Sequence, residues 1–355
     1  MSFVEFRGVT KSFGRTAAVE QLDVGIAQGE FFSLLGPSGC GKSTTLRMLA
    51  GFIAPSTGSI HVHGRDITHL PPEKRDIGIV FQNYAIFPHM NVADNIAFGL
   101  VERGEDAATI RRKVGAALEQ VGLAGYEARF ERELSGGQKQ RVALARVLVI
   151  EPEILLLDEP LSALDKKMRE EMKFWIKNIQ HEIGITTIYV THDQSEALTM
   201  SDRIAVMERG RVLQIGSPVE IYEQPASRFI AEFIGESNLL PARLARADGT
   251  SGAVEVAGAQ VPARLAQPGL SAGAEVAFLI RPEQIRLEPW SADEAPMLTG
   301  KVADETYQGA LRRYRIDAAG QHLTVEVPNR PELAQLPPGA DVQLYWRPES
   351  GLALG

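Results

Sequence analysis

A glycine-rich stretch carries the clearest chemistry in this sequence. Residues 36–43 follow the pattern G-x-x-x-x-G-K-S, after a mostly apolar run at 30–35 and before a segment with helical spacing. A strand, a glycine-rich turn and a helix, in that order, are the context that a phosphate-binding loop requires. Glycines let backbone amides wrap around an anion, and the helix N-terminus adds further N–H groups. We predict that Lys42 binds the β- and γ-phosphates of a nucleotide and that Ser43 ligates Mg²⁺. The predicted nucleotide-binding residues here are Gly36, Pro37, Ser38, Gly39, Cys40, Gly41, Lys42, Ser43 and Thr44.

Two acidic residues follow a second apolar run. Residues 154–157 are Ile-Leu-Leu-Leu, and Asp158 and Glu159 come next. A continuous apolar run of this length predicts a central parallel strand, and open α/β sheets bind ligands at the carboxyl ends of such strands. Asp158 is therefore a candidate Mg²⁺ ligand, and Glu159 a candidate to orient or deprotonate water. His192 ends another buried strand pattern at 186–191, so we expect it within reach of a phosphate; a capping role alone is the alternative.

A second candidate anion site opens a helix further along the chain. Ser135 and Gln138 have the spacing of a capping box before the helical segment 139–150. Gly136 and Gly137 are costly in a first helical turn unless something must approach the backbone closely there. We therefore expect a ligand near this helix N-terminus.

Three other features allow alternatives. Phe13 can stack on an adenine ring or be a core aromatic. Cys40, the one cysteine, lies by a helix N-terminus, where a thiol has a lowered pKa and reacts readily; a small filler residue is the alternative. The histidines at 61, 63 and 69 fit an exposed β ribbon better than a metal site, because carboxylate and thiol partners are missing from the cluster.

The composition bounds the classes of function. The chain has 355 residues, 44% of them hydrophobic, which is enough for two or three domains. A net charge of −8 provides no basic field for nucleic acid, so we expect no nucleic-acid partner. The N-terminus lacks a signal-peptide pattern, and no apolar run approaches the roughly 20 residues of a membrane span. Any membrane role is therefore expected to come through a partner.

The coarse pattern divides the chain into layers. Residues 1–30 alternate like an antiparallel β layer, 91–150 are mostly helical, and 203–215 read as a hairpin. Beyond about residue 235 the chain is rich in Ala, Gly and Pro, with short alternating strands that predict a small all-β barrel.

Five segments together resemble one family. The phosphate loop, Leu-Ser-Gly-Gly-Gln at 134–138, Ile-Leu-Leu-Leu-Asp-Glu-Pro at 154–160, Leu-Ser-Ala-Leu-Asp at 161–165 and Thr-His-Asp at 191–193 occur in the order found in ABC transporter ATPase subunits. The resemblance spans about residues 3–235. It implies a P-loop NTPase fold of the α/β class: a RecA-like core with an antiparallel β subdomain and a helical subdomain at about 88–150.

The resemblance also implies roles. In chain order, the matching positions are Phe13 (adenine stacking), Gln82 (sensing of Mg²⁺ and the attacking water), Ser135, Gly136, Gly137 and Gln138 (closure on the ATP of the other subunit), Glu159 (catalytic base), Asp165 (link between the two sites) and His192 (switch at the γ-phosphate). Family members hydrolyse ATP with Mg²⁺ as head-to-tail dimers, and one chain carries one set of motifs. We therefore expect a homodimer.

The segment 84–90 is apolar for a loop, and its spacing alone favours inward packing. The resemblance instead favours contact with a membrane subunit. It implies two integral membrane permease subunits as partners, a periplasmic or extracellular solute-binding protein as an indirect partner, and a peripheral place on the cytoplasmic face of the cell membrane.

The C-terminal part resembles the OB-like, TOBE-type β-barrel extension of importer ATPases for sugars, polyamines, iron(III), sulfate and phosphonates. Residues 281–286 are typical of it, and 233–238 look most like the polyamine members. We predict an ATPase domain at 1–235 and a barrel domain at 236–355 that stabilises the dimer or senses a regulator. The expected function is the motor of an importer, with a polyamine as substrate. The alternatives are iron(III), 2-aminoethylphosphonate, sulfate or sugar uptake, a soluble ABC ATPase without a transport role, and a phosphoryl-transferring kinase.

Overall fold

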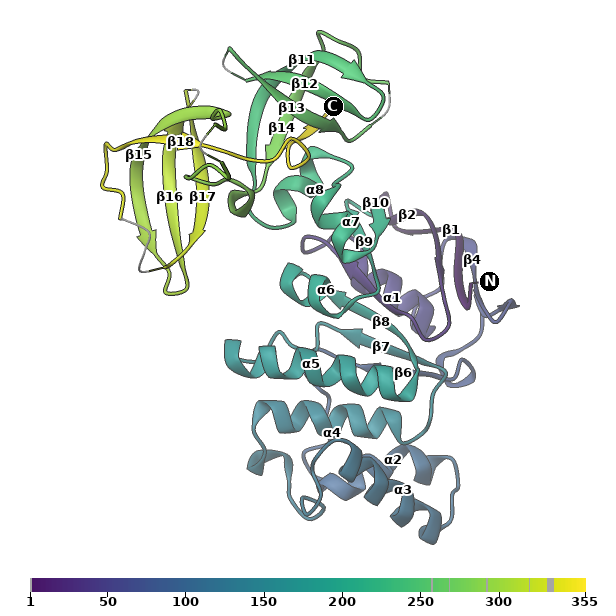
Figure 1. Cartoon of the computed structure of the whole chain (residues 1–355). Coiled ribbons are helices and arrows are strands. Elements are labelled where there is room, and N and C mark those ends of the chain that lie inside the picture. Colours follow the sequence, from purple (N-terminus) through teal and green to yellow (C-terminus); the bar gives the residue numbers. More distant parts are fainter. Residues whose placement is uncertain (1, 257, 268, 292, 319, 331–334) are drawn as a thin grey trace. The chain divides into compact units, whose positions relative to one another are not determined.

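The computed structural model describes residues 2–256, 258–267, 269–291, 293–318, 320–330 and 335–355. The chain divides into two compact units, Met1–Pro218 and Val219–Gly355. Figure 1 labels most of their helices and strands.

A six-stranded sheet forms the centre of the first unit, in the order β10-β9-β3-β8-β7-β6. Its strands are β3 (Phe31–Leu35), β6 (Ile77–Val80), β7 (Ile154–Asp158), β8 (Thr186–Thr191), β9 (Arg203–Glu208) and β10 (Arg211–Gly216). The first five pair in parallel, and the β9–β10 hairpin is antiparallel at the edge. Every residue of β3, β7 and β8 is buried, which explains their continuous apolar sequences. The carboxyl ends of these three strands therefore meet at one edge.

The predicted antiparallel layer is present beside this sheet. It has the order β2-β1-β4-β5, with strands β1 (Val4–Phe13), β2 (Thr16–Ile26), β4 (Thr57–Val62) and β5 (Arg65–Asp66). Helix α1 (Lys42–Ala50) and the buried faces of both sheets share one hydrophobic core, which includes Phe6, Leu46 and Ile188. A short 3₁₀ turn, η1 (Pro72–Lys74), leads into β6.

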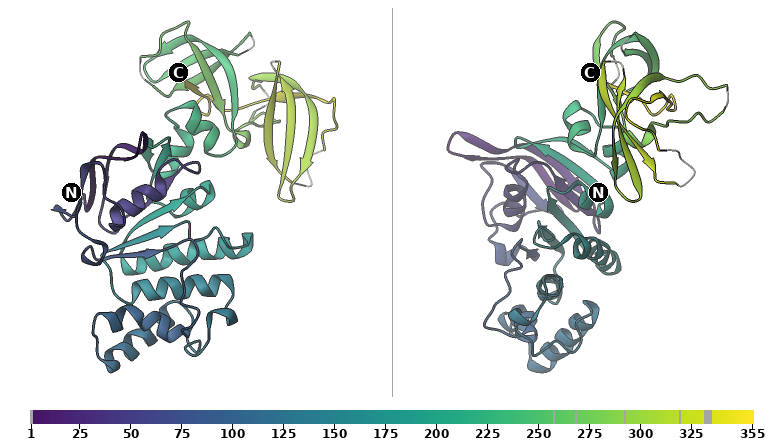
Figure 2. Two further views of the ribbon diagram at one scale, coloured as in Figure 1. Left: turned by 180° about the vertical axis from the view of Figure 1, so that it is seen from behind. Right: turned by 90° about the vertical axis from the view of Figure 1, so that its left-hand side faces the viewer.

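Besides α1, the first unit has five α-helices and one further 3₁₀ turn among its described residues. They are α2 (Val92–Glu102), α3 (Ala107–Gln120), the 3₁₀ turn η2 (Glu131–Glu133), α4 (Gly136–Leu148), α5 (Lys166–Ile183) and α6 (Gln194–Met200). Figures 1 and 2 show α4 and α5 side by side. The predicted apolar stripe of α3 is confirmed, because Val114, Ala117 and Leu118 are buried against α2 and α4.

The second unit begins with two short helices and continues as β structure. Its elements are α7 (Pro218–Glu223), α8 (Arg228–Phe233), β11 (Asn238–Asp248), β12 (Ser251–Val256), β13 (Ala259–Leu265), β14 (Glu275–Ile280), the 3₁₀ turn η3 (Pro282–Gln284), β15 (Leu298–Tyr307), β16 (Leu311–Ala318), β17 (Gln321–Pro328), β18 (Asp341–Leu344) and β19 (Leu352–Leu354). Strands β11-β12-β13-β19-β14 close a barrel, and β17-β16-β15-β18 form a separate sheet. The predicted barrel is therefore joined by a four-stranded sheet.

Buried Arg281 binds α7 and α8 to this second unit. Its guanidinium donates to the carbonyl oxygens of Tyr222 (2.7 Å), Ile234 (2.6 Å) and Glu236 (3.1 Å). Ala231 of α8 also packs on the barrel strands β14 and β19. By its contacts the second unit thus starts at Val219, earlier than the sequence-based boundary after residue 235.

Candidate functional site

The phosphate loop joins β3 to α1 in a shape that requires glycine. Gly39 and Gly41 have φ angles of 80° and 106°, in the left-handed region that residues with a Cβ rarely adopt. A Cβ atom at Gly36 would lie 2.2 Å from the carbonyl oxygen of Met207, and one at Gly41 would lie 2.4 Å from that of Ala18. The loop is therefore packed tightly from behind.

Lys42 is buried and bends back over this loop. Its Nζ donates to the carbonyl oxygens of Gly36 (2.7 Å) and Pro37 (2.9 Å). The loop carbonyls thus hold the ammonium group beside the concave backbone where the sequence predicts phosphates. A mobile, positively charged group at this position can exchange these carbonyls for phosphate oxygens.

Ser43 and Asp158 bring two oxygen ligands together. Ser43 Oγ donates to Asp158 Oδ1 at 3.0 Å, joining the first turn of α1 to the end of β7. Burial raises the pKa of the Asp158 carboxyl, and the Ser43 hydrogen bond opposes this rise. A buried carboxylate is stabilised by a cation, and Mg²⁺ prefers oxygen ligands, so this pair fits the predicted metal.

Gln82 lies at the same edge of the sheet. It follows β6, and the register pairs Val80 of β6 with Leu157 of β7, so the chain next reaches the level of Asp158 and Glu159. Gln82 is exposed. Its place fits the predicted approach to the metal and water.

Within the described residues, no group of three or more His, Cys, Asp and Glu side chains could hold a metal ion. His61 Nε2 instead hydrogen-bonds Ser59 Oγ at 2.9 Å, and His63 packs edge-to-face on Phe3. These contacts of His61 and His63 agree with the interpretation of the histidines at 61, 63 and 69 as part of a β ribbon.

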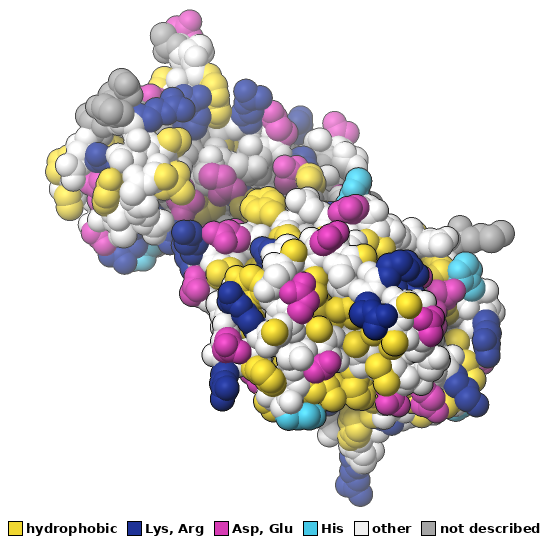
Figure 3. Space-filling model, turned by 90° about the horizontal axis from the view of Figure 1, so that it is seen from below, with side chains coloured by type: hydrophobic (Ala, Val, Ile, Leu, Met, Phe, Trp, Pro, Cys, Tyr) yellow, Lys and Arg dark blue, Asp and Glu magenta, His cyan; other side chains and the backbone are white. Residues whose placement is uncertain are grey.

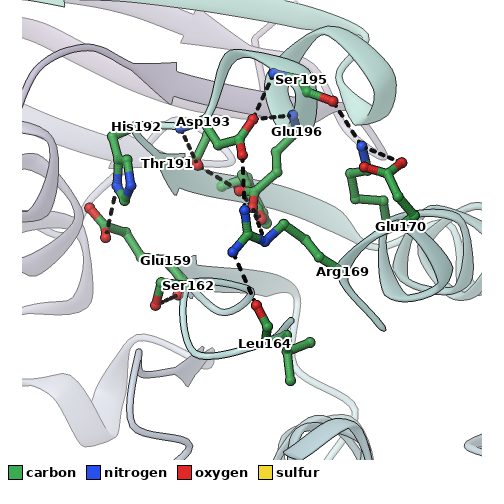
Figure 4. Close-up of polar contacts among 12 residues, drawn as sticks. Glu159, Ser162, Leu164, Arg169, Glu170, Thr191, His192, Asp193, Ser195 and Glu196 are labelled. Atoms are coloured by element: carbon green, nitrogen blue, oxygen red, sulfur yellow. Dashed lines mark hydrogen bonds and ion pairs between the residues drawn. The ribbon is translucent and has the colours of Figure 1, made fainter. Parts of the chain in front are cut away.

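Glu159 and His192 meet in front of the sheet. The Nδ1 atom of His192 lies 3.1 Å from Oε2 of Glu159, as Figure 4 shows. Glu159 has a φ of 47°, which is rare for a residue with a Cβ, and its N–H donates to the carbonyl oxygen of Val190 in β8. Strain of this kind costs about 1–3 kcal/mol and concentrates at functional sites. The backbone therefore holds this carboxylate in place, at the edge that also carries Asp158.

The signature segment, residues 134–138, opens α4 as predicted. Gln138 N donates to Ser135 Oγ (3.3 Å) and Ser135 N donates to Gln138 Oε1 (2.9 Å), which completes the capping box. A Cβ at Gly136 would lie 3.0 Å from Leu164 Cδ2, and one at Gly137 would lie 2.7 Å from Met168 Sδ. The expected close approach to these glycines therefore occurs within the chain itself, while Ser135 and Gly136 also remain exposed.

Asp165 begins α5 close to the signature segment. Its Oδ1 accepts a hydrogen bond from Met168 N at 3.0 Å and caps the helix. We call residues 161–165 the linking loop. Its Leu164 is the residue that touches Gly136.

Phe13 ends β1 with its ring in solvent. It is 55% exposed, so the alternative of a core aromatic is wrong. Lys11 Nζ lies 5.2 Å from the ring centroid. An exposed ring at a strand end can stack on a purine base.

Cys40 departs from its expected chemistry. The residue is buried, and burial raises the pKa of its thiol although Lys42 and nearby backbone N–H groups act in the opposite direction. The prediction of a lowered pKa is therefore wrong. The small-filler alternative agrees better with a thiol packed beneath Gly36.

The segment 84–90 is divided between the core and the surface. Tyr84 is buried, while Phe87 is half-buried and lies 4.8 Å, centroid to centroid, from the partly exposed Phe98. Arg146 of α4 donates to the carbonyl oxygens of Tyr84 (3.2 Å) and Ala85 (2.7 Å), which both have positive φ. Figure 3 shows hydrophobic side chains gathered on the face of the first unit seen from the side of α2–α4.

Sequence reasoning missed a polar cluster behind His192. Glu196 has the spacing of a helix-capping residue, but its carboxylate points inward and accepts hydrogen bonds from Tyr189 (2.8 Å) and Thr191 (2.6 Å). Burial raises the pKa of this carboxyl. Arg169 of α5 completes the cluster. In the sequence, Arg169 is marked only by its position four residues after the linking loop, and this position does not indicate its partners.

Comparison with known proteins covers both units. Residues 19–162 match the family model described as ABC transporter, and residues 278–354 match the model described as TOBE domain. No helix found among the described residues combines the length and apolar character that crossing a membrane requires.

Full-length relatives extend these matches. The chain is 49% identical to the spermidine/putrescine import ATP-binding protein PotA of Acidothermus cellulolyticus, over 99% of this chain and 94% of that protein. It is 48% identical to the protein of the same name from Rubrobacter xylanophilus, over 99% and 93%. Among solved structures, the dimeric post-hydrolysis state of the ATP-binding cassette MJ0796 bound to ADP and Pi matches with a TM-score of 0.54 and 30% identity, over 61% of this chain and 98% of that chain. This chain therefore belongs to the family of import ATP-binding proteins of ABC transporters, ATPases whose nucleotide-binding region is followed by a TOBE domain.

Proposed function

We propose that this chain hydrolyses ATP in a head-to-tail homodimer and that the cycle drives polyamine uptake through membrane partners. One observation carries the hydrolytic part. The Ser43–Asp158 pair and the Glu159–His192 pair lie at the carboxyl ends of neighbouring strands, next to the phosphate loop. Similarity over both units to proteins named for spermidine and putrescine import supports the substrate class.

The side chains at this edge take distinct roles in the proposal. Ser43 and Asp158 hold Mg²⁺, and Gln82 completes its surroundings; the ion, when bound, neutralises charge on the β- and γ-phosphates. Glu159 accepts the proton of the attacking water. His192, which contacts Glu159, lies on the side of the site where the γ-phosphate binds.

A second copy of the chain supplies the other wall of the site. Ser135 and Gly136 are exposed at the N-terminus of α4, where N–H groups and the helix dipole favour an anion. We propose that the segment from Ser135 to Gln138 closes on the γ-phosphate bound by the partner's phosphate loop. Phe13 stacks on the adenine, and Asp165 lies near the contact between the two copies.

The partners follow from the import function. We propose two permease subunits that contact the segment 84–90 beside Phe98, which places the chain on the cytoplasmic face of the cell membrane. A periplasmic or extracellular solute-binding protein acts indirectly, by delivering the substrate to the permeases. The C-terminal domain, from about residue 236, stabilises the dimer or senses a regulator.

The proposal is tested with the complete transporter in vesicles. The chain is co-expressed with candidate permeases, purified as a complex and reconstituted with ATP on the side of this subunit and a candidate solute-binding protein on the opposite side. Uptake of radiolabelled spermidine is measured with and without unlabelled putrescine, iron(III), 2-aminoethylphosphonate, sulfate or a sugar.

We expect ATP-dependent uptake that putrescine inhibits and the other solutes leave unchanged. A complex carrying Glu159→Gln is the matched control and should not accumulate spermidine. Uptake of another solute alone would contradict the polyamine assignment. Failure to co-purify with any integral membrane protein would favour a soluble ABC ATPase without a transport role.

A further inference from the structure

We propose that Arg169 is a positioning residue that couples the linking loop to the residues around His192. We call residues 191–193 the switch loop. The linking loop packs against the signature glycines. Arg169 makes the position of His192 relative to Glu159 depend on the position of that loop. The inference rests on the roles of Glu159 and His192 proposed above.

Arg169 joins three segments with one guanidinium. Its Nη2 donates to the carbonyl oxygen of Leu164 in the linking loop at 3.1 Å, and its Nη1 donates to Asp193 Oδ2 in the switch loop at 3.4 Å. Its Nε lies 3.9 Å from Oε1 of Glu196 in α6. Figure 4 shows the guanidinium between these groups. A planar group with donors in a fixed fork can hold such partners in one relative arrangement.

The switch loop is held on both sides of the histidine. Thr191 Oγ1 donates to Glu196 Oε2 at 2.6 Å and accepts from Asp193 N at 2.9 Å. Asp193 uses one oxygen, Oδ1, to cap α6 through Ser195 N, which leaves Oδ2 for Arg169. The His192 side chain itself is about half exposed and reaches Glu159. Its position is therefore set by flanking residues that depend on Arg169 and Glu196.

Glu196 is a fixed partner that anchors the Arg169 guanidinium. The residue is 3% exposed, and the hydroxyls of Tyr189 and Thr191 both donate to its Oε2. A buried carboxylate needs a nearby positive charge, and Arg169 is the cation facing its other oxygen. This ion pair between a buried carboxylate and a partly exposed guanidinium keeps the guanidinium between the two loops.

The other end of the coupling lies at the signature segment. Leu164 is buried, and its side chain contacts Gly136 while its carbonyl oxygen accepts from Arg169. Met168, one residue before Arg169, packs in the same way on Gly137. A displacement of the signature glycines when they meet the partner's nucleotide would therefore move Leu164 and α5. Arg169 would pass this displacement to Asp193 and, through it, to His192.

The test uses the full-length chain and steady-state ATP hydrolysis. Arg169→Ala removes all three contacts, and Arg169→Lys keeps the charge but can satisfy fewer partners at once. Lys177→Ala is the matched control, because Lys177 is also a basic residue of α5 paired with an aspartate, Asp202, away from both loops. Melting temperature and ATP affinity are measured beside kcat and KM. His192→Ala is included to test the proposed function separately.

We expect Arg169→Ala to lower kcat by roughly 10- to 100-fold, because small misplacements of a catalytic group carry losses of that order. ATP affinity should stay within about two-fold of wild type, because the three contacts that the substitution removes lie outside the phosphate loop. The kcat of Arg169→Lys should lie between those of wild type and Arg169→Ala. Lys177→Ala should retain wild-type kcat. In a double-mutant cycle, Arg169→Ala and Asp193→Asn should be non-additive in kcat, whereas Arg169→Ala and Lys177→Ala should add.

Wild-type kcat in Arg169→Ala would overturn the proposal. An equal fall in kcat in Lys177→Ala would also overturn it, and so would additive effects of Arg169→Ala and Asp193→Asn on kcat. Either of these two results would indicate that Arg169 has a merely structural role. If Arg169→Ala does not fold, Arg169→Lys and its cycle with Asp193→Asn decide the question in the same way. Loss of activity in His192→Ala with normal activity in Arg169→Ala rejects the coupling alone. Normal activity in His192→Ala rejects the role of the switch itself.

Discussion

Replacing Glu159 by Gln should separate ATP binding from hydrolysis. The two side chains have the same shape, so Gln can keep the 3.1 Å contact with His192 and the backbone bond to Val190. Its amide cannot accept the proton of the attacking water. Loss of a positioned general base lowers a rate by about 10²- to 10⁴-fold, which corresponds to roughly 3–5 kcal/mol in activation free energy.

The strained backbone at Glu159 argues that this loss is chemical rather than structural. The positive φ of 47° is set by neighbours that the substitution leaves in place. We therefore expect ATP to bind Glu159→Gln with near wild-type affinity and to trap a dimer, detected by sedimentation with ATP but not with ADP. Phosphate release in single-turnover assays measures the rate. Glu171→Gln, an exposed carboxylate on α5, is the control and should behave as wild type. A turnover rate for Glu159→Gln within two-fold of wild type would refute its role as the base.

Three other residues give separate tests. Phe13→Ala should raise the KM for ATP by about 2- to 10-fold with little change in kcat, the loss of a stacking energy of about 0.5–1.5 kcal/mol, while Phe13→Tyr should not; equal kinetics in both would remove the stacking role. Asp158→Asn should raise the Mg²⁺ concentration needed for half-maximal hydrolysis by about ten-fold or more, because a charged oxygen ligand is lost, and an unchanged Mg²⁺ titration would contradict this. Alkylation of Cys40 by iodoacetamide should be slow near neutral pH and keep rising above pH 9, since burial raises the thiol pKa and the thiolate is the reactive form; fast alkylation at pH 7 would show the opposite shift.

The local sequence is enough to predict the site residues that lie at the carboxyl ends of buried strands. The apolar runs before Gly36, Asp158 and His192 fold as fully buried strands, and their parallel pairing brings all three to one edge. The capping box of Ser135 and Gln138 is likewise local, because both partners lie within one helical turn.

Tertiary contacts decide the features that the sequence could not predict. Glu196 has the spacing of a cap, yet the hydroxyls of Tyr189 and Thr191 draw its carboxylate into the interior. Cys40 lies near a helix N-terminus, which lowers a thiol pKa, but burial outweighs that effect. Arg169 acquires its partners from two loops and from α6, which meet only in the folded chain.

The second unit shows the same limit for strand pairing. Alternation predicted several of its short strands, but it did not predict the other barrel strands or the division into a barrel and a sheet. The final strand β19 pairs in parallel with β13 and antiparallel with β14, across a long separation in sequence, and so closes the barrel. Alternation within a strand carries no information about such distant partners.

The composite dimer site is tested most directly by mixing two defective chains. Both carry Glu159→Gln to trap ATP; one also carries Lys42→Ala in the phosphate loop, and the other carries Ser135→Arg in the signature segment. A head-to-tail dimer of the two has one site in which both walls are intact, whereas neither chain alone can build one.

We predict that each chain alone retains almost no radiolabelled ATP on gel filtration and that the mixture retains up to one ATP per mixed dimer. Retention no greater than the sum of the separate chains would contradict a site shared between the phosphate loop of one copy and the signature segment of the other.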